Sequence, residues 1–282
     1  MSRGHGFPPP AVFAADRPLV FAHRGGAKLG PENTIPAFAR GFAAGADGFE
    51  CDVRQSRDGV PMVIHDATLD RTTDRTGPVA ALTAAELARV DATCRFTPDA
   101  DVTWASPPVG IAPLAEALAA FPTARFIIEL KDDSEDFARA VVDVVRAAAA
   151  GSRVCLGSFN HRVVQAVRAA APELATSASE PEARWLLYRS HLRWPRLRRS
   201  AFSSMQVPEV AGRLRVTSPG FFRQVHREGC VAQIWTVDRP EDVRRLFDWG
   251  ADGVITDRPD IVVPVRDAWH RETAKPGAVS SR

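Results

Sequence analysis

Two short stretches that end apolar runs carry residue types suited to phosphate chemistry. The first stretch begins with His23 and Arg24. The second contains Glu50 and Asp52, on either side of Cys51. Side chains alternate faces along a strand, so Glu50 and Asp52 point the same way while Cys51 points the other way. Two carboxylates on one face, together with a histidine and an arginine, would suit a metal-assisted attack on a phosphate ester.

A second pair of charged residues repeats the two-residue spacing. Glu129 and Lys131 can therefore both face inward. A carboxylate buried beside an ammonium group is tolerated only where the two are paired or hold an ion. Two interpretations stay open from the residues alone: a plain ion pair, or a third carboxylate that joins Glu50 and Asp52. Three carboxylates in one place would require a cation.

The rest of the sequence predicts the elements that must position these side chains. Short β-branched or aromatic runs alternate with longer Ala-, Leu- and Arg-rich helical stretches, which is typical of βα units. Eight strands in 282 residues favour a closed (β/α)₈ TIM barrel over an open doubly wound sheet, because such a barrel takes about 250 residues. The predicted strands span residues 19–23, 48–53, 126–131, 154–159, 174–179, 201–207, 231–237 and 253–257.

Two of the helical stretches carry clear start signals. Asn33 is predicted to cap a helix that runs through Ala44. Ser134 is followed by two acidic residues that favour the positive end of a helix dipole, which predicts a helix through Val142 into Ala150. The apolar faces of these helices would cover the strands.

The pattern predicts one barrel domain with a small insertion. Residues 61–66 follow a turn and are predicted as a short strand that forms a hairpin with the second barrel strand. The proline-bearing stretch 67–110, between strands two and three, is predicted as an insertion over one end of the barrel. The domain is expected to span 18–269, with a flexible N-terminal segment at 1–17 and a flexible tail at 270–282.

Composition and charge exclude several classes of protein. A net charge of +2 is too small for a nucleic-acid partner, since non-specific binding to DNA depends on clustered Lys and Arg residues. The four cysteines are scattered without a CxxC pair, which indicates neither a zinc ribbon nor a disulfide framework. Residues 1–16 lack the continuous apolar run of a secretory signal, so a cytoplasmic protein with reduced thiols is expected.

A series of motifs along the chain is similar to a known family. Taken together, in their order and spacing, they resemble the glycerophosphodiester phosphodiesterase family over roughly residues 18–264. The resemblance implies a TIM barrel with a small insertion, and hydrolysis of a glycerophosphodiester to glycerol 3-phosphate and an alcohol with one bound Mg²⁺ or Ca²⁺. The motifs are His23-Arg24-Gly25-Gly26, Pro31-Glu32-Asn33-Thr34, Ala37-Phe38, Gly48-Phe49-Glu50-Cys51-Asp52-Val53, Asp58-Gly59, His65-Asp66, Leu69-Asp70-Arg71-Thr72-Thr73, Glu129-Leu130-Lys131, Trp235-Thr236-Val237 and Ile255-Thr256-Asp257-Arg258-Pro259.

Matched position by position, the resemblance implies a role for each charged residue of the site. Histidine titrates near neutrality, so one imidazole can accept a proton while the other donates one to the departing alkoxide. An all-oxygen ligand set favours a hard cation over zinc. Attack by water and attack by a neighbouring substrate hydroxyl, through a cyclic phosphate, both stay open. The matches are the catalytic acid/base pair His23 and His65, the metal ligands Glu50, Asp52 and Glu129, and the phosphate-contacting Arg24 and Lys131.

Two aromatic features have two interpretations each. Trp235 is either core filler or the wall of a substrate pocket, and we include it in the substrate-binding set. The stretch Arg184 to Arg199 mixes arginines with aromatic and aliphatic residues. It fits an ordinary outer helix with a solvated basic face, or a helix that makes peripheral contact with an anionic membrane surface. Membrane contact would favour lysophospholipids or related lipid diesters as substrates.

Two alternative functions belong to other classes. A phospholipase D of the sphingomyelin-cleaving kind shares the histidine pair and the Glu-x-Asp motif, but such enzymes are usually secreted and have Asp where this chain has Glu129. A non-catalytic phosphate- or lipid-binding module would not need both His23 and His65. A small-molecule phosphodiester is therefore the expected partner.

Overall fold

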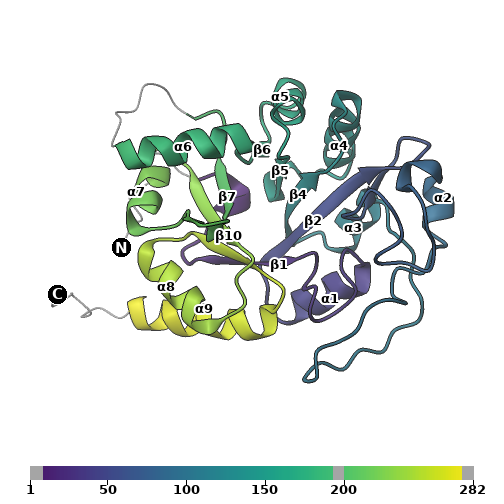
Figure 1. The fold of residues 1–282 in the computed structure, drawn as a ribbon, viewed down its shortest axis with the longest axis horizontal. Helices are drawn as coiled ribbons and strands as arrows, with labels where there is room; N and C mark the ends of the chain where they lie inside the picture. Colours follow the sequence, from purple (N-terminus) through teal and green to yellow (C-terminus); the bar gives the residue numbers. More distant parts are fainter. Residues whose placement is uncertain (1–8, 193–199, 275–282) are drawn as a thin grey trace.

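A ring of parallel strands inside a layer of helices forms the centre of the molecule (Figure 1). The computed structural model describes residues 9–192 and 200–274 of the 282-residue chain. Each of the eight predicted strands corresponds to an observed one, so the predicted (β/α)₈ barrel is confirmed. The barrel strands are β1 (Leu19–His23), β2 (Gly48–Gln55), β4 (Arg125–Leu130), β5 (Val154–Gly157), β6 (Ala175–Thr176), β7 (Ser204–Pro208), β10 (Val231–Trp235) and β11 (Gly253–Thr256).

The strands follow the order β6-β5-β4-β2-β1-β11-β10-β7 around the barrel. The two ends of this series meet at an isolated parallel bridge between Ser177 and Ser204. The backbone N–H of Ala178 donates to the carbonyl of Ser204, and that of Ser203 donates to Thr176. The barrel is therefore nearly closed, with a short seam between β6 and β7.

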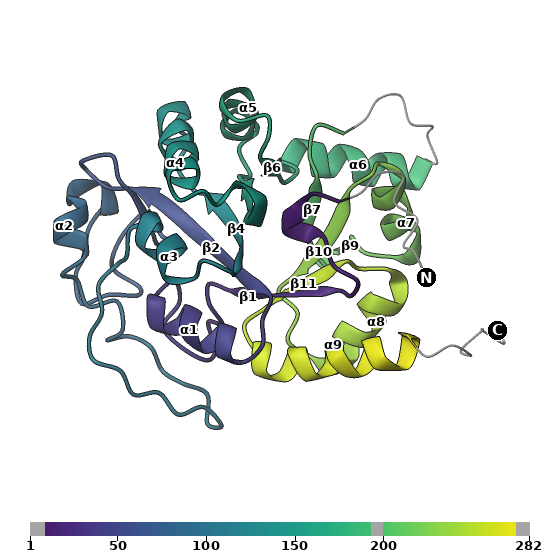
Figure 2. The ribbon, with the colours of Figure 1, turned by 180° about the vertical axis from the view of Figure 1, so that it is seen from behind.

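Helices cover the outside of the barrel, as the view from behind also shows (Figure 2). Strand side chains that point outward, including Phe49, Cys51 and Phe126, are buried against these helices. Cys51 thus faces away from Glu50 and Asp52, as the alternation predicted. The helices are α1 (Ile35–Ala43), α3 (Leu114–Ala120), α4 (Glu135–Ala147), α5 (His161–Ala170), α6 (Glu180–Leu192), α7 (Pro219–Arg227), α8 (Pro240–Trp249) and α9 (Pro259–Ala274).

The two predicted helix caps have different outcomes. Ser134 caps α4 by accepting a hydrogen bond from the Phe137 backbone, as predicted. The prediction of Asn33 as the cap of α1 is wrong, because Thr34 accepts the capping bond. Asn33 has a φ of 58° and donates from its side-chain nitrogen to Asp52 Oδ2 at 2.9 Å. Its amide is used inside the barrel and not at the helix terminus.

The insertion between β2 and β4 has a small apolar core of its own. Met62, Leu69 and Leu87 are buried there with five other residues. The predicted hairpin strand is shorter than expected, so His65 and Asp66 lie in the loop after it. The regular elements of this region are β3 (Pro61–Val63), which pairs antiparallel with β2, the 3₁₀ helix η2 (Val79–Ala81) and α2 (Ala84–Leu87).

The N-terminal segment differs from the flexible segment predicted for 1–17. Residues 1–8 lie outside the described part, but Ala11–Phe13 form the 3₁₀ helix η1. Val12 and Phe13 are buried, and the Phe13 ring meets the Phe21 ring edge-on at 6.2 Å between centroids. The physical reason is that these apolar side chains fill the barrel interior near the strand beginnings, beside η3 (Gly151–Arg153).

The C-terminal end also differs in part from the predicted boundary. Helix α9 continues to Ala274, past the start of the tail predicted at 270–282. The rest of that tail, residues 275–282, lies outside the described residues. Helix α9 therefore crosses residue 269, and the domain boundary that we placed there stays a prediction.

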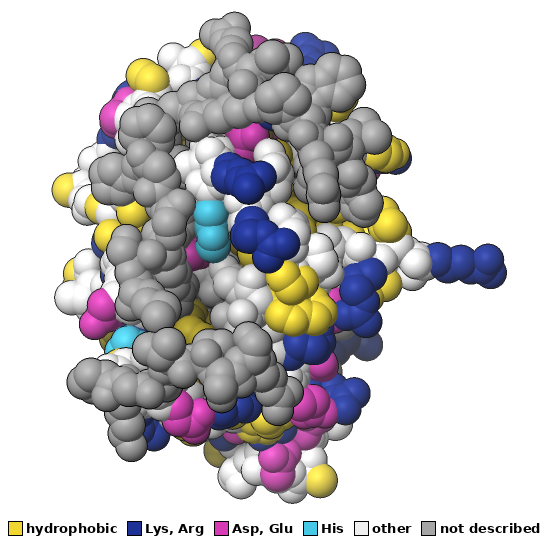
Figure 3. Space-filling model, turned by 90° about the vertical axis from the view of Figure 1, so that its left-hand side faces the viewer, with side chains coloured by type: hydrophobic (Ala, Val, Ile, Leu, Met, Phe, Trp, Pro, Cys, Tyr) yellow, Lys and Arg dark blue, Asp and Glu magenta, His cyan; other side chains and the backbone are white. Residues whose placement is uncertain are grey.

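The surface carries charges of both signs. Figure 3 shows Lys and Arg side chains gathered near the centre of one face, and Asp and Glu side chains toward its lower edge. Within the described helices, none is both long enough and apolar enough to cross a membrane.

Helix α6 begins the predicted basic and aromatic stretch, whose residues 193–199 lie outside the described residues. Trp185 is exposed on this helix. The Arg189 side chain is buried, and its guanidinium lies 3.3 Å from Glu228. Arg189 is therefore not part of a solvated basic face on this helix.

Candidate active site

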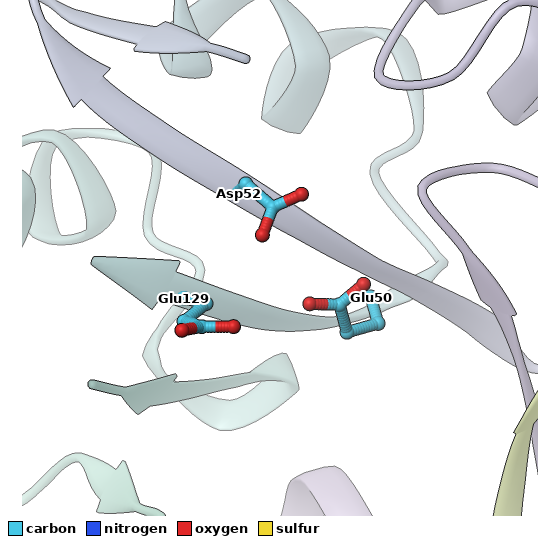
Figure 4. A group of neighbouring side chains, drawn as sticks. All are labelled: Glu50, Asp52 and Glu129. Atoms are coloured by element: carbon cyan, nitrogen blue, oxygen red, sulfur yellow. The ribbon is translucent and has the colours of Figure 1, made fainter. Parts of the chain in front are cut away.

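The charged residues gather because of the register between neighbouring strands. His23 on β1 stands beside Glu50 on β2, and Asp52 stands beside Glu129 on β4. Paired residues in a sheet project to the same face, so these side chains all enter the barrel interior. Figure 4 shows the side chains of Glu50, Asp52 and Glu129 converging from β2 and β4. One oxygen from each lies within 4.8 Å of the others.

Two cations lie directly against Asp52, which is almost fully buried. Lys131 Nζ is 3.0 Å from Asp52 Oδ1 and 2.8 Å from Glu129 Oε2, and Arg24 Nε is 3.2 Å from Asp52 Oδ2. Burial acts to raise the pKa of Asp52, but the charges of Lys131 and Arg24 hold it below its ordinary value. Asp52 is therefore a carboxylate at neutral pH.

Glu50 has a different environment from Asp52. Burial, followed by the charge of Asp52, raises the pKa of Glu50 to about 8. Its Oε2 atom is buried and has no hydrogen-bond partner among the described residues. A cation beside this oxygen would satisfy it and would offset the repulsion between the carboxylates. Glu50, Asp52 and Glu129 could thus hold a divalent metal ion.

His23 is held by the last barrel strand. Its Nδ1 lies 2.7 Å from Asp257 Oδ1, just after β11, and its Nε2 lies 3.8 Å from Glu50 Oε2. Since a carboxylate accepts hydrogen bonds, Nδ1 donates and Nε2 points toward Glu50. Burial acts to lower the pKa of His23, but the hydrogen bond to Asp257 and the charge of Glu50 raise it above 6.5.

His65 is held by a chain of charged groups in the loops. Its Nδ1 lies 2.6 Å from Asp66 Oδ1. Arg71 donates to Asp66 Oδ2 at 2.6 Å and to both Glu32 oxygens at 2.7 Å. Glu32 in turn accepts from Arg24 at 2.8 Å. The hydrogen bond from Arg71 holds the pKa of Asp66 well below its ordinary value.

A tight turn after β1 aims Arg24 at Asp52. Arg24 has a φ of 51°, in the left-handed region that non-glycine residues seldom adopt. Gly25 follows at 91°, and a Cβ there would lie 2.5 Å from Cδ1 of Phe38. The turn therefore packs its backbone directly on α1, which requires glycine. The buried Nε of Arg24 makes no hydrogen bond within the described residues.

One cavity of about 930 Å³ connects all of the predicted site residues. The Trp235 ring forms part of its wall and meets Phe159 edge-on at 6.4 Å between centroids. Trp235 both lines the cavity and packs against buried core residues, and its contact with a substrate stays a prediction. The predicted residues that line the cavity are His23, Arg24, Glu50, Asp52, His65, Glu129, Lys131 and Trp235.

Comparison with known proteins identifies the family. The model of the glycerophosphoryl diester phosphodiesterase family matches residues 23–261. The chain belongs to this family. It is 33% identical over 260 residues to a glycerophosphodiester phosphodiesterase of Caldanaerobacter subterraneus subsp. tengcongensis, covering 87% of this chain and 96% of that protein. The predicted resemblance is thereby confirmed, and the protein is an enzyme of the phosphodiesterase class.

Solved structures agree with this assignment. A glycerophosphoryl diester phosphodiesterase structure from Silicibacter pomeroyi, described as putative, has a TM-score of 0.74 and 25% identity, covering 95% of this chain and 97% of that one. A phosphodiesterase of Oleispira antarctica, solved with the product sn-glycerol-3-phosphate, has a TM-score of 0.70. It is 23% identical over 89% of this chain and 97% of its own, and this likeness supports the fold.

The candidate site includes residues for which the sequence predicted no role. Asp257 contacts His23, Glu32 joins Arg24 to Arg71, and Gln206 lines the cavity. A signal for Asp257 was present, because it lies two positions after Ile255 at the end of the last predicted strand. Glu32 precedes the first barrel helix, in a loop where no periodicity indicates which way a side chain points.

Proposed function

We propose that this enzyme hydrolyses glycerophosphodiesters to glycerol 3-phosphate and an alcohol, with a divalent cation and a pair of histidines. The observation that carries the proposal is the convergence of His23, His65 and three carboxylates in one cavity. Family membership supports the reaction class. The glycerol 3-phosphate bound to the Oleispira antarctica phosphodiesterase supports the nature of the product.

Glu50, Asp52 and Glu129 would hold Mg²⁺ or Ca²⁺, since all three offer oxygen atoms that suit hard cations. The buried Oε2 of Glu50, which has no partner among the described residues, supports this assignment. When bound, the cation would polarise a phosphoryl oxygen of the substrate.

Arg24 and Lys131 would bind the phosphate group. Both are partly buried cations on the cavity wall, and both already lie within 3.2 Å of Asp52. Cations fixed in this position would offset negative charge that develops on the phosphoryl oxygens during the reaction. Trp235 would form a wall of the space beside the phosphate.

His23 and His65 would move the protons. Each has its Nδ1 held by an aspartate, which leaves Nε2 for the substrate. One imidazole would accept a proton from the attacking hydroxyl or water, and the other would donate a proton to the departing alkoxide. Asp257 and Asp66 do not touch the substrate in this scheme and act by orienting the rings.

The test is phosphorus NMR of the purified protein with glycerophosphocholine. We expect a glycerol 3-phosphate signal with Mg²⁺ or Ca²⁺, and its loss with excess chelator. Glu50→Gln should require a higher metal concentration, while Glu241→Gln, an exposed acidic residue on α8, should behave as the parent. Product that forms equally well with chelator would contradict the metal assignment.

We also propose the cytoplasm as the compartment. The support is that Cys51 and Cys155 are buried as reduced thiols. Fractionation of the native host with an antibody to the protein tests this, and recovery from the extracellular or membrane fraction would contradict it.

A further inference from the structure

The cavity continues beyond the charged residues along two apolar walls. Helix α6 supplies one wall through Ala183, Leu187 and Tyr188. The other wall is a small hairpin, β8 (Val210–Ala211) and β9 (Leu214–Arg215), which contributes Ala211 and Leu214. The residues of both walls line the same cavity as the catalytic histidines.

The walls expose apolar side chains at the outer part of this cavity. The exposed fraction is 61% for Tyr188 and 48% for Leu214. Exposed apolar side chains that gather around one cavity are typical of a ligand-binding groove, whereas singly scattered ones are not. Arg184 and Glu180 of α6 also line the cavity, and they are paired with each other at 3.1 Å, so their charges offset one another within the wall. The outer part of the cavity therefore suits an uncharged, apolar group.

The cavity is also large for a small phosphodiester. Its volume of about 930 Å³ lies near the upper end of the roughly 300–1,000 Å³ range of pockets that enclose drug-sized ligands. Glycerol and phosphate would lie beside the carboxylates and the two cations. The apolar part of the cavity would then be left to a further portion of the same substrate.

We propose that the phosphodiester substrate carries an alkyl or acyl chain, which lies between α6 and the β8–β9 hairpin. This inference rests on the proposed function and names its substrate class. The reaction is net hydrolysis: the phosphorus–oxygen bond to the leaving alcohol breaks, a bond from an oxygen of water to phosphorus forms in its place, and the alcohol oxygen takes a proton.

The chain could be attached to either side of the phosphate, and the first experiment distinguishes the two. One series contains glycerol 3-phosphate esterified to ethanol, hexanol and decanol, so the chain is on the leaving alcohol. The other contains glycerophosphocholine and its hexanoyl and decanoyl monoesters, so the chain is on the glycerol. All are assayed with Mg²⁺ below their micellar concentrations, by phosphorus NMR.

We expect kcat/KM to rise by about fourfold for each methylene that enters the apolar part of the cavity, in one series or in both. The series that shows the rise identifies where the chain is attached. A kcat/KM that does not rise with chain length in either series overturns the inference but leaves the proposed function intact. Failure of the proposed function is separate, since no compound would then give a product.

Two pairs of variants then locate the chain, because each pair has nearly equal exposure. Leu214 and Val210 are 48% and 47% exposed on the same hairpin, and Leu214 lines the cavity while Val210 does not. Tyr188 and Trp185 are 61% and 60% exposed on α6, and Tyr188 lines the cavity while Trp185 does not.

Leu214→Asn and Tyr188→Ser should each lower kcat/KM for the preferred decyl or decanoyl compound by about threefold to tenfold. Both should leave the shortest compound of the same series unchanged. Val210→Asn and Trp185→Ser should leave both compounds unchanged, which controls for effects on folding. Equal losses in lining and non-lining variants, or equal losses on short and long compounds, would overturn the placement.

Discussion

The two histidines that we propose as the acid/base pair are held in different ways. His23 ends a barrel strand, and its partner Asp257 follows the strand that pairs with β1. His65 lies in a loop beyond the short strand β3, and its partner Asp66 is held by Arg71 of the insertion. The position of His23 thus depends on the barrel ladder, whereas that of His65 depends on surface ion pairs. Two groups that do similar chemistry can therefore differ in how easily distant substitutions disturb them.

Removal of either imidazole should cause the largest fall in kcat, and this fall should not distinguish His23 from His65. His23→Ala and His65→Ala should each lower kcat by roughly 10²- to 10⁴-fold, the usual contribution of acid/base catalysis. The measurement is release of glycerol 3-phosphate from glycerophosphocholine with Mg²⁺. Full turnover by His65→Ala would contradict its assignment, and circular dichroism checks that each variant is folded.

Removal of the aspartate partners should begin to separate the histidines. Asp257→Asn and Asp66→Asn should each lower kcat by about tenfold to a hundredfold, because hydrogen bonds to charged groups contribute roughly 1.5–3 kcal/mol.

The pH dependence of the rate should distinguish the two histidines more clearly. Asp257 helps to raise the pKa of His23, so Asp257→Asn should lower that pKa. The limb of the pH–rate profile that reports His23 should then move to lower pH. A profile that stays in place while kcat falls would mean that Asp257 acts on geometry alone.

Substitution of Arg71 should affect His65 and not His23. Arg71→Ala leaves Asp66 and Glu32 without their shared cation, and we expect kcat to fall by about threefold to tenfold. The matched control is Arg57→Ala, because Arg57 is similarly exposed and pairs with Glu86 of the insertion. If Arg71→Ala also shifted the pH limb of His23, the separation between the two supports would be wrong.

The smallest expected effect is on stability in acid. The pKa of Asp66 is lowered in the folded protein, so its contribution is present above about pH 4 and is lost as the pH falls through the folded-state value. The contribution should be on the order of 1 kcal/mol, as for a partly exposed ion pair. Urea unfolding at neutral pH should therefore show the parent to be more stable than Asp66→Asn.

The difference between these two proteins should shrink as the pH falls below 4. A difference that stays the same from neutral to acidic pH would show that the Asp66 carboxylate is not the cause of the acid sensitivity.

The sequence predicted most of the barrel because periodicity along a strand is a local property. The two-residue spacing in Glu50 and Asp52 was enough to place both side chains inside the ring, and Cys51 outside it. The cap of α1 could not be chosen in this way. Asn33 and Thr34 are both good capping residues, and Asn33 contacts Asp52, a residue distant in sequence.

The same limit applies at the ends of the domain and in α6. The composition of residues 1–17 gave no sign that Val12 and Phe13 fill the barrel interior, because the space exists only once the ring has formed. Arg189 belongs to a basic stretch in sequence, yet it lies against Glu228, the residue that caps the C-terminal end of α7. Long-range partners of this kind are not visible in local patterns.

The seam between β6 and β7 is a place where the ring of strands can open locally. Backbone hydrogen bonds link these strands through Ser177 and Ser204 and their neighbours, whereas β2 and β4 share a six-residue register. Local opening should therefore cost least at this seam, and amide hydrogens there should exchange early. Because α6 follows β6 directly, a small movement at the seam would change the spacing of the apolar walls without moving the strands that carry the carboxylates. The strands that can adapt and the strands that hold the carboxylates in place are thus different parts of one barrel.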